Sequence, residues 1–336
     1  SANGTNSGIV WALQMGTPAV LVAGNATNFT TELYNSGQAA GNRDQLANGT
    51  KFAAPVVADG KVFVGSSNSV SVFGLLAGTF AFSSPTYSVP ESNTTANITV
   101  NRISGTNGAV QVSYVTVAGG TATNGVNYTG VSGALNWTNG ESAPKTFTVP
   151  ILNDGQAKPN ATVNLALSNP TSGAALALQS TAVLTIIEPP TSVWKLAHFG
   201  TNANNNAVAG DSVDPDQDGG VNLMEYAFAT DPNVANPSSF TDNLVGQKFQ
   251  LHFPRNTSAS DIAYIVETSG TLMTWSNLMT YTAASGWVTN LTGASVSESS
   301  SNGVPPDQYV NVTITTSTNV TSPVLTNQFL RLEVHR

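Results

Sequence analysis

Short runs in which apolar and polar residues alternate, separated by Gly, Asn and Pro, recur along almost the whole chain. Clear examples are residues 88–102, 109–117 and 143–152. Alternation with a period of two places every second side chain on one face of a β-strand, and turn residues end such strands early. The pattern predicts a mainly β fold and argues against a helical bundle or a parallel α/β sheet.

The chain has 336 residues, which is too many for one ordinary domain. Two breaks in composition, near residues 75–82 and at 188–191, predict three segments: a β segment (1–77), a sandwich (78–189), and a third segment in which a loop with a short helix (190–240) precedes a second small sandwich (241–336). The adjacent Pro189 and Pro190 mark one boundary, because proline ends a strand. The one clear helical pattern covers residues 221–229.

Charged residues make up only 9% of the chain, against roughly 25% in a typical globular domain. The net charge of −8 argues against nucleic acid as a partner. No apolar run reaches the ~18 residues that a membrane span needs, so no membrane insertion is expected. The chain has no cysteine, which excludes disulfides and thiol chemistry. This composition is typical of a bacterial extracellular protein, and a start at Ser1 fits either a processed product or a fragment.

The strongest motif is an acidic loop of twelve residues, 214–225. Calcium prefers oxygen ligands, and a loop of this length supplies them at positions one, three, five, seven, nine and twelve. Those positions hold Asp214, Asp216, Asp218, Gly220, Asn222 and Glu225. Gly219 at position six permits the sharp turn. The motif predicts a calcium site, and the alternative is an acidic, solvated turn. Asp211 and Asp231 flank the loop and are expected to act as caps or outer contacts.

The first segment contains GIVWAL, ELYNS and PVVADGKVFVGSSNSVSVFGLL, in which Asp59 and Gly60 suit a hairpin turn. These stretches resemble the last blade of a quinoprotein-type (PQQ-repeat) β-propeller. The resemblance implies one four-stranded blade, with strands at 8–14, 19–24, 52–65 and 69–75, whose edges and one face are uncovered. No PQQ is expected, because many blades build that cofactor site. Either this chain is the C-terminal piece of a longer propeller protein, or the blade pairs with a neighbouring chain.

The second segment contains YSVPES, GTATNGVNYTG, GALNWTNGES and KTFTVPILNDG, and closely resembles a Calx-β domain, an immunoglobulin-like sandwich. The resemblance implies a calcium site at one tip. Glu91, Asp154 and Glu188 match its acidic positions, whereas Asn127 stands where the family has Asp. Gln156, Lys158 and Asn160 replace further acidic residues. Three carboxylates predict a weak calcium site, and the alternative is a structural sandwich without calcium.

The third segment contains VWKLAHFG and DSVDPDQDGGVNLMEYAFATDPN. It resembles the C-terminal modules of large secreted bacterial (Verrucomicrobia-like) proteins, in which a calcium loop and short helix precede a small β-sandwich. Sandwich strands are expected at 262–268, 286–291, 309–316 and 328–334. Because no helix is expected before the loop, the loop resembles those of dockerins and thrombospondin repeats.

Thirteen Asn-x-Ser/Thr sequons are present, and all but one carry Thr. Their asparagines are Asn3, Asn25, Asn28, Asn48, Asn93, Asn97, Asn127, Asn136, Asn160, Asn256, Asn290, Asn311 and Asn319. Dense N-glycosylation would make a charge-poor surface soluble. The alternative is a polar surface that is simply rich in Asn and Thr.

No pattern of catalytic residues emerges. His198, His252 and His335 do not pair with a nucleophile or a second metal ligand, and common hydrolase and metalloprotease motifs are missing. We therefore predict a non-enzymatic, extracellular, calcium-binding structural or adhesive protein. It is expected to assemble with itself into filaments or a surface layer, with cell-surface glycans as further candidate partners. The alternative is a C-terminal accessory region (spacer, glycan-binding or export module) of a larger secreted propeller enzyme.

Overall fold

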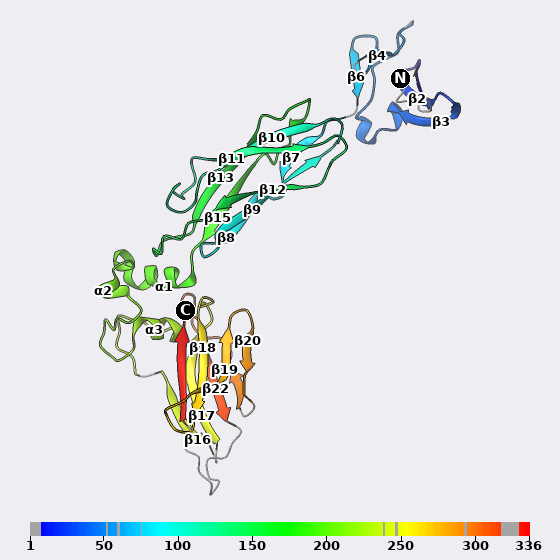
Figure 1. Cartoon of the computed structure of the whole chain (residues 1–336). Coiled ribbons are helices and arrows are strands. Elements are labelled where there is room, and N and C mark those ends of the chain that lie inside the picture. The colour runs from blue at the N-terminus through cyan, green and yellow to red at the C-terminus, as the bar shows by residue number, and fades with distance from the viewer. Residues whose placement is uncertain are drawn as a thin grey trace.

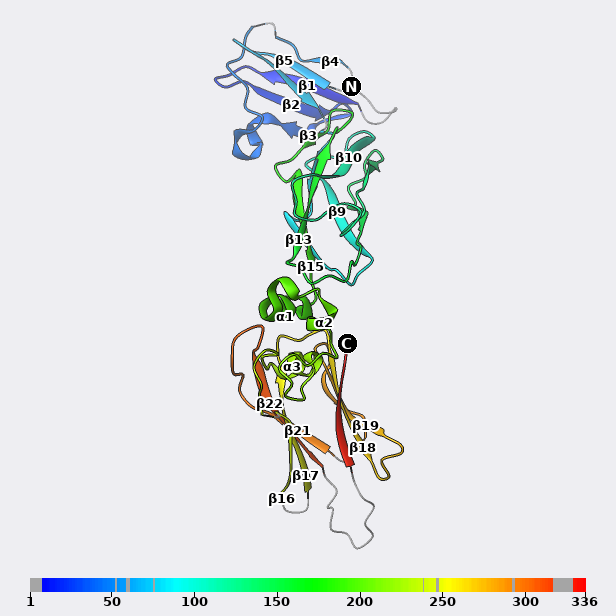
Figure 2. The ribbon, with the colours of Figure 1, turned by 90° about the vertical axis from the view of Figure 1, so that its left-hand side faces the viewer.

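A computed structural model of the chain describes residues 8–51, 53–58, 61–74, 76–237, 239–245, 248–291, 294–316 and 329–336. The chain forms an elongated row of β-modules, with the N-terminal sheets at one end and the C-terminal sandwich at the other (Figures 1 and 2). The prediction of a mainly β fold with several modules is confirmed. Among the described residues, no helix has the length and apolar character needed to cross a bilayer.

The N-terminal segment contains two three-stranded antiparallel sheets. The first consists of β1 (Ile9–Gln14), β2 (Val20–Asn25) and β3 (Asn28–Asn35), and the second of β4 (Val56–Ala58), β5 (Lys61–Gly65) and β6 (Val70–Gly74). Leu21, Val62 and Val64 are buried in their shared core. The expectation of one four-stranded blade is therefore wrong. Polar β3 lacks the alternation that identifies a strand, and the predicted turn at Asp59 and Gly60 lies outside the described residues.

The outer face of the second N-terminal sheet is apolar. Val56 pairs with Phe63, which in turn pairs with Val72, so these three side chains share one face. Val62 and Val64 point to the opposite, buried face. Val56 is 59% exposed and Val72 53% exposed, so this face is not covered within the described chain.

The second module is a sandwich of two sheets. One has the order β11-β10-β13-β15-β8, and the other has the order β12-β9-β7-β14. The strands are β7 (Thr79–Phe82), β8 (Thr86–Pro90), β9 (Thr95–Ile103), β10 (Val110–Val117), β11 (Ser132–Trp137), β12 (Lys145–Pro150), β13 (Ala161–Ser168), β14 (Ala175–Leu176) and β15 (Thr181–Ile187). The strand predicted over 88–102 is divided between β8 and β9, which lie in different sheets.

A buried arginine closes one end of this sandwich. Arg102 on β9 is 3% exposed, and all of its five N–H groups donate to backbone carbonyls. The acceptors are Ala77 at 2.9 Å, Thr138 and Glu141 at 3.1 Å, and Asn107 and Gly108 at 3.0 Å. Three separate segments are thereby tied to one side chain.

Three helices follow: α1 (Pro190–Phe199), α2 (Asn206–Ala209) and α3 (Asn222–Phe228). The expectation that no helix precedes the acidic loop is wrong, because α1 and α2 both do. Pro190 lies in the first turn of α1, where a missing N–H costs no hydrogen bond. Trp194 on α1 is fully buried, and its ring lies 5.4 Å from that of Tyr226 on α3.

The C-terminal sandwich has eight strands, of which the sequence predicted four. Its sheets have the orders β16-β17-β22-β21 and β20-β19-β18-β23. The strands are β16 (Thr241–Val245), β17 (Lys248–Asn256), β18 (Ala263–Ser269), β19 (Ser276–Thr282), β20 (Gly286–Thr289), β21 (Ala294–Glu298), β22 (Tyr309–Thr316) and β23 (Phe329–His335). Trp194 and Tyr226 share one core with Phe253 and Tyr264. The predicted boundary at residue 240 therefore divides a single packed module.

Candidate calcium sites

The acidic loop lies between α2 and α3. The carboxylates of Asp214, Asp216 and Asp218 each place an oxygen within 4.8 Å of the others. Gly219 has φ of +95°, in the left-handed region that glycine enters without strain. A Cβ at Gly220 would lie 3.0 Å from Asp218 Oδ1, so a side chain there would displace the Asp218 carboxylate by a few tenths of an ångström.

Backbone N–H groups hydrogen-bond to each of the loop aspartates, and Asp216 accepts the N–H of Asp218 at 3.2 Å. Asp214 accepts the backbone N–H groups of Gln217 at 2.8 Å and Gly219 at 3.0 Å. Asp218 accepts those of Gly220 and Asn236, both at 2.7 Å, and these two bonds lower its pKa. The loop is therefore shaped by its own backbone before any cation is considered.

Glu225 lies beside this cluster, in the first turn of α3. Its side chain is buried, and neither carboxylate oxygen has a hydrogen-bond partner. Burial raises the pKa of Glu225 to about 7, and the charges of the three loop aspartates add to the shift. A buried carboxylate without donors is costly unless a cation neutralises it. The donor set of four carboxylates and a preformed turn therefore fits a calcium ion.

Asn222 has a structural contact that the motif did not predict. Its Nδ2 group donates to the carbonyls of Val208 and Gly210, each at 2.8 Å, which ties the start of α3 to the end of α2. Its Oδ1 is buried without a partner. Ligation by Asn222 and by the Gly220 carbonyl stays a prediction.

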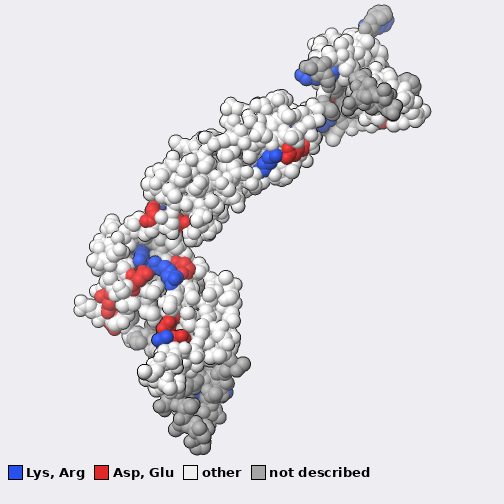
Figure 3. All heavy atoms as spheres, viewed as in Figure 1, with Lys and Arg blue, Asp and Glu red and all other residues white. Residues whose placement is uncertain are grey.

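The two flanking aspartates form ion pairs. Asp211 contacts Lys195 at 3.1 Å and Arg336 at 2.8 Å, and Asp231 lies 3.3 Å from His198. Figure 3 shows the charged atoms of this region gathered near the junction of the second and third modules, between large uncharged faces. Both residues therefore have partners outside the acidic loop.

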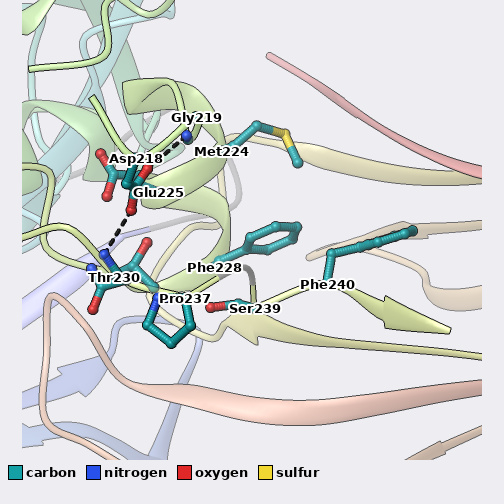
Figure 4. A pocket seen from close by; sticks show the side chains of 11 residues that line it. Asp218, Gly219, Met224, Glu225, Phe228, Thr230, Pro237, Ser239 and Phe240 are labelled. Atoms are coloured by element: carbon teal, nitrogen blue, oxygen red, sulfur yellow. Dashed lines mark hydrogen bonds between the residues drawn. The ribbon is translucent and has the colours of Figure 1, made fainter. Parts of the chain in front are cut away.

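A pocket of about 250 Å³ opens beside the loop (Figure 4). Asp218 and Glu225 lie on one side of it, and Met224, Phe228 and Phe240 contribute apolar surface. The acidic cluster thus borders an apolar hollow between α3 and the C-terminal sandwich.

The tip of the second module gathers the other predicted ligands around a lysine. Lys158 Nζ lies 2.6 Å from Glu91, 2.5 Å from Asp154 and 3.1 Å from Glu188. Asn127 also joins this cluster, because its Nδ2 donates to Asp154 at 3.0 Å. The predicted residues do come together, but an ammonium group lies among their carboxylates. As arranged, they do not fit a calcium ion.

Two of the predicted glycosylation sites are wrong. Asn127 is 5% exposed and Asn256 is fully buried, with its Nδ2 donating to the Tyr226 carbonyl at 2.8 Å. Neither can carry a glycan in the folded chain. Asn3 and Asn319 lie outside the described residues. The remaining asparagines lie at the surface: Asn25, Asn28, Asn48, Asn93, Asn97, Asn136, Asn160, Asn290 and Asn311.

The histidines take structural positions. His198 lies between Asp307 at 3.1 Å and Asp231, whereas His252 contacts Thr313 and His335 contacts Glu333. Although burial opposes it, the hydrogen bond and charge of Asp307 raise the pKa of His198. Within the described parts of the chain, none of the three faces a serine or threonine nucleophile together with an acid.

Without calcium, stability of the third module is expected to fall as pH rises from about 5 to about 8. The folded pKa of Glu225 is about 7, above its ordinary value of 4.5, so the folded state holds this proton more tightly than the unfolded state. That advantage is present at low pH and is lost as pH rises through the folded pKa. Calorimetry in chelator across this range measures the effect.

The variant Glu225→Gln isolates the contribution of Glu225 to this pH dependence. Because the raised pKa of His198 shifts stability in the same direction, the contribution of Glu225 is the part that this substitution removes. Equal pH slopes for wild type and variant would contradict the assignment. In saturating calcium the wild-type slope should flatten or reverse, since calcium binds the deprotonated carboxylate.

Residues 76–190 match the family model of the Calx-beta domain. Calx-beta domains are calcium-binding, non-catalytic β-sandwich modules. Among solved structures, the chain is similar to the apo form of the Calx CBD1 domain, with 24% identity, a TM-score of 0.31, and coverage of 33% of this chain and 96% of that one. It is also similar to the calcium-binding domain CBD12 of CALX1.1, with 17% identity, a TM-score of 0.35, and coverage of 62% and 73%. A comparison with curated proteins gives no match.

Proposed function

We propose that this chain is a non-enzymatic, calcium-binding structural protein of the cell exterior, which associates with copies of itself. The observation that carries the proposal is Glu225, a buried carboxylate with no hydrogen-bond donor, whose pKa is raised by burial and by the charges of the nearby cluster of Asp214, Asp216 and Asp218. A bound calcium ion would neutralise the negative charges gathered here, and few other ligands would do so. The Calx-beta match over residues 76–190 supports a modular rather than an enzymatic chain.

Calcium at the acidic loop would act on the shape of the third module. The loop connects α2 to α3, and α3 packs against β17 and the shared core. Binding there would fix the start of α3, so its free energy would add directly to folding. Extracellular calcium modules bind with dissociation constants on the order of 10⁻⁴ to 10⁻³ M, which suits a structural ion outside the cell.

Self-association would use the outer face of β4, β5 and β6. Val56 and Val72 expose apolar surface on a short sheet with few charges, and an apolar patch rimmed by polar residues marks an interaction site. β1 and β3, as well as β4 and β6, are outer strands of their sheets. A second copy of the same segment offers the complementary apolar face and strand edges.

Val72→Asp is expected to weaken this association at least tenfold. The substitution would place a charge in an interface that excludes water, whereas the 53% exposed valine tolerates it in the single chain. Sedimentation velocity over a concentration series, with electron microscopy of the same samples in calcium and in chelator, measures the effect. Val126→Asp is the matched control, since Val126 is 47% exposed but lies on the second module. A wild-type chain that stays monomeric would refute self-association.

The same apolar face supports the second candidate function. Preceding propeller blades in a longer polypeptide would cover β4, β5 and β6 just as a second copy would. The chain would then be the accessory region of a larger secreted enzyme. Upstream GIVWAL-type repeats in the gene would favour this candidate. Glycans on the surface asparagines belong to either proposal, and glycopeptide mass spectrometry tests them.

A further inference from the structure

We propose that Lys158 replaces calcium at the tip of the second module, and that this tethered ammonium holds the joint to the third module in a calcium-independent way. The proposal concerns the cluster of Glu91, Asp154 and Glu188, not the acidic loop at residues 214–225. Calcium would then act at the acidic loop and not at this tip.

The cluster contains its own cation. Lys158 Nζ donates hydrogen bonds to Glu91 at 2.6 Å and to Asp154 at 2.5 Å, and it forms an ion pair with Glu188 at 3.1 Å. The side chains of Glu91 and Glu188 are 2% and 0% exposed, so they would be strongly destabilising without a nearby positive charge. Calcium binds carboxylates at 2.3–2.6 Å and would have to lie where the ammonium lies. The two cations therefore exclude one another.

The carboxylates come from segments that are distant in sequence. Glu91 follows β8, Asp154 lies in the loop after β12, and Glu188 follows β15 directly. Asp154 is also held by Asn127. Burial alone would lower the pKa of Lys158, but the three neighbouring carboxylates outweigh burial and raise it. The lysine therefore keeps its charge in neutral solution. A single side chain thus connects the three segments at the end of the sandwich.

This end of the sandwich is also the joint. Ala157, the neighbour of Lys158, donates its N–H to Asn204 Oδ1 at 2.6 Å and accepts from Asn204 Nδ2 at 3.0 Å. Ala157 is buried in the core of the third module, together with Trp194. Glu188 stands two residues before α1. Lys158 therefore lies beside both connections between the modules, the chain that leads from Glu188 into α1 and the hydrogen bonds of Ala157 with Asn204. Holding Lys158 in place stabilises both.

The test removes the lysine in a chain whose acidic loop has been disabled. Glu225→Gln should abolish calcium binding by the full-length chain in isothermal titration calorimetry. Glu225→Gln with Lys158→Met should regain one calcium per chain, with a dissociation constant on the order of 10⁻³ M or tighter. Lys145→Met in the same background is the matched control, because Lys145 pairs with Glu141 at 2.7 Å away from this tip. It should bind no calcium.

Several results would overturn the proposal. If Glu225→Gln retains a calcium site that Glu91→Gln abolishes, the lysine does not exclude calcium. If Lys158→Met creates no site, the cluster is not a displaced calcium site. Failure of the loop itself to bind calcium would appear in the chain with Lys158 intact, and would count against the proposed function instead.

A second measurement does not depend on any Lys158 variant folding. Small-angle X-ray scattering of the wild-type chain should give the same radius of gyration in calcium and in chelator if the joint is calcium-independent. Limited proteolysis should likewise leave the bonds around residues 188–190 uncut in both conditions. Opening of the joint on chelation would refute the proposal.

Discussion

Replacing Glu225 with glutamine is expected to have opposite effects on stability with and without calcium. In chelator the variant should melt at or above the wild-type temperature, because it removes a buried carboxylate whose pKa is raised to about 7 and which has no hydrogen-bond donor. In saturating calcium it should melt well below wild type, because the carboxylate at position twelve of the loop is lost.

The size of the effect follows from mass action. Calcium at about one hundred times its dissociation constant stabilises the folded chain by about 2.7 kcal/mol. For a module of this size, each kcal/mol moves the melting temperature by roughly 2–4 °C. Calorimetry of the third module in calcium and in chelator measures the change in melting temperature under each condition, and so the sign of each change. Asp242→Asn, at an exposed carboxylate on β16, is the control and should shift neither curve. Equal calcium responses of variant and wild type would contradict the site.

Arg102→Lys is expected to destabilise the second module by about 3 kcal/mol. Arginine satisfies five backbone carbonyls here, whereas lysine has only three donors on a single nitrogen. At least two buried acceptors would lose their partner, and each such loss costs roughly 1–3 kcal/mol. Because lysine keeps the positive charge, the loss of stability would come from the missing hydrogen bonds and not from a change in charge.

Hydrogen–deuterium exchange in a urea series, read on peptides from residues 79–103, locates this effect in the second module. Arg43→Lys is the matched control, because the Arg43 side chain is 70% exposed and its pair with Asp44 lies at the surface. An exposed substitution of this kind is expected to change stability by less than about 0.5 kcal/mol. If Arg102→Lys behaved like the control, the five-bond description would be wrong.

The gathering of the loop aspartates could be predicted from sequence because these residues are local in the chain. Asp214 and Glu225 are separated by one loop and one helical turn, so spacing alone places them together. The tip of the second module is different. Glu91 and Glu188 are brought together by the parallel pairing of β8 with β15. The family resemblance implied that the two residues share one tip, but not this pairing. That Lys158 would point into the cluster depends on packing across three segments, and no local pattern indicates it.

The missed elements have similar explanations. β3 has no apolar alternation of its own and is formed by pairing with β2. α1 starts at Pro190, the second of two adjacent prolines. Two prolines indicate the end of a strand, but proline is also common in the first turn of a helix, so the sequence alone does not distinguish the two. The burial of Asn127 and Asn256 was likewise not predictable, since a sequon carries no information about tertiary contacts.

The pairing of β8 with β15 has a mechanical consequence. These strands run parallel, with Thr86 opposite Val183 and Pro90 opposite Ile187, and they lie near the entry and the exit of the second module. Tension between the two ends of the row would pull β8 and β15 in opposite directions along their length. Their hydrogen bonds lie across that direction and would be loaded together in shear rather than opened one at a time. Under such tension the pairing of β8 with β15 would resist extension of the second module along the axis of the molecule.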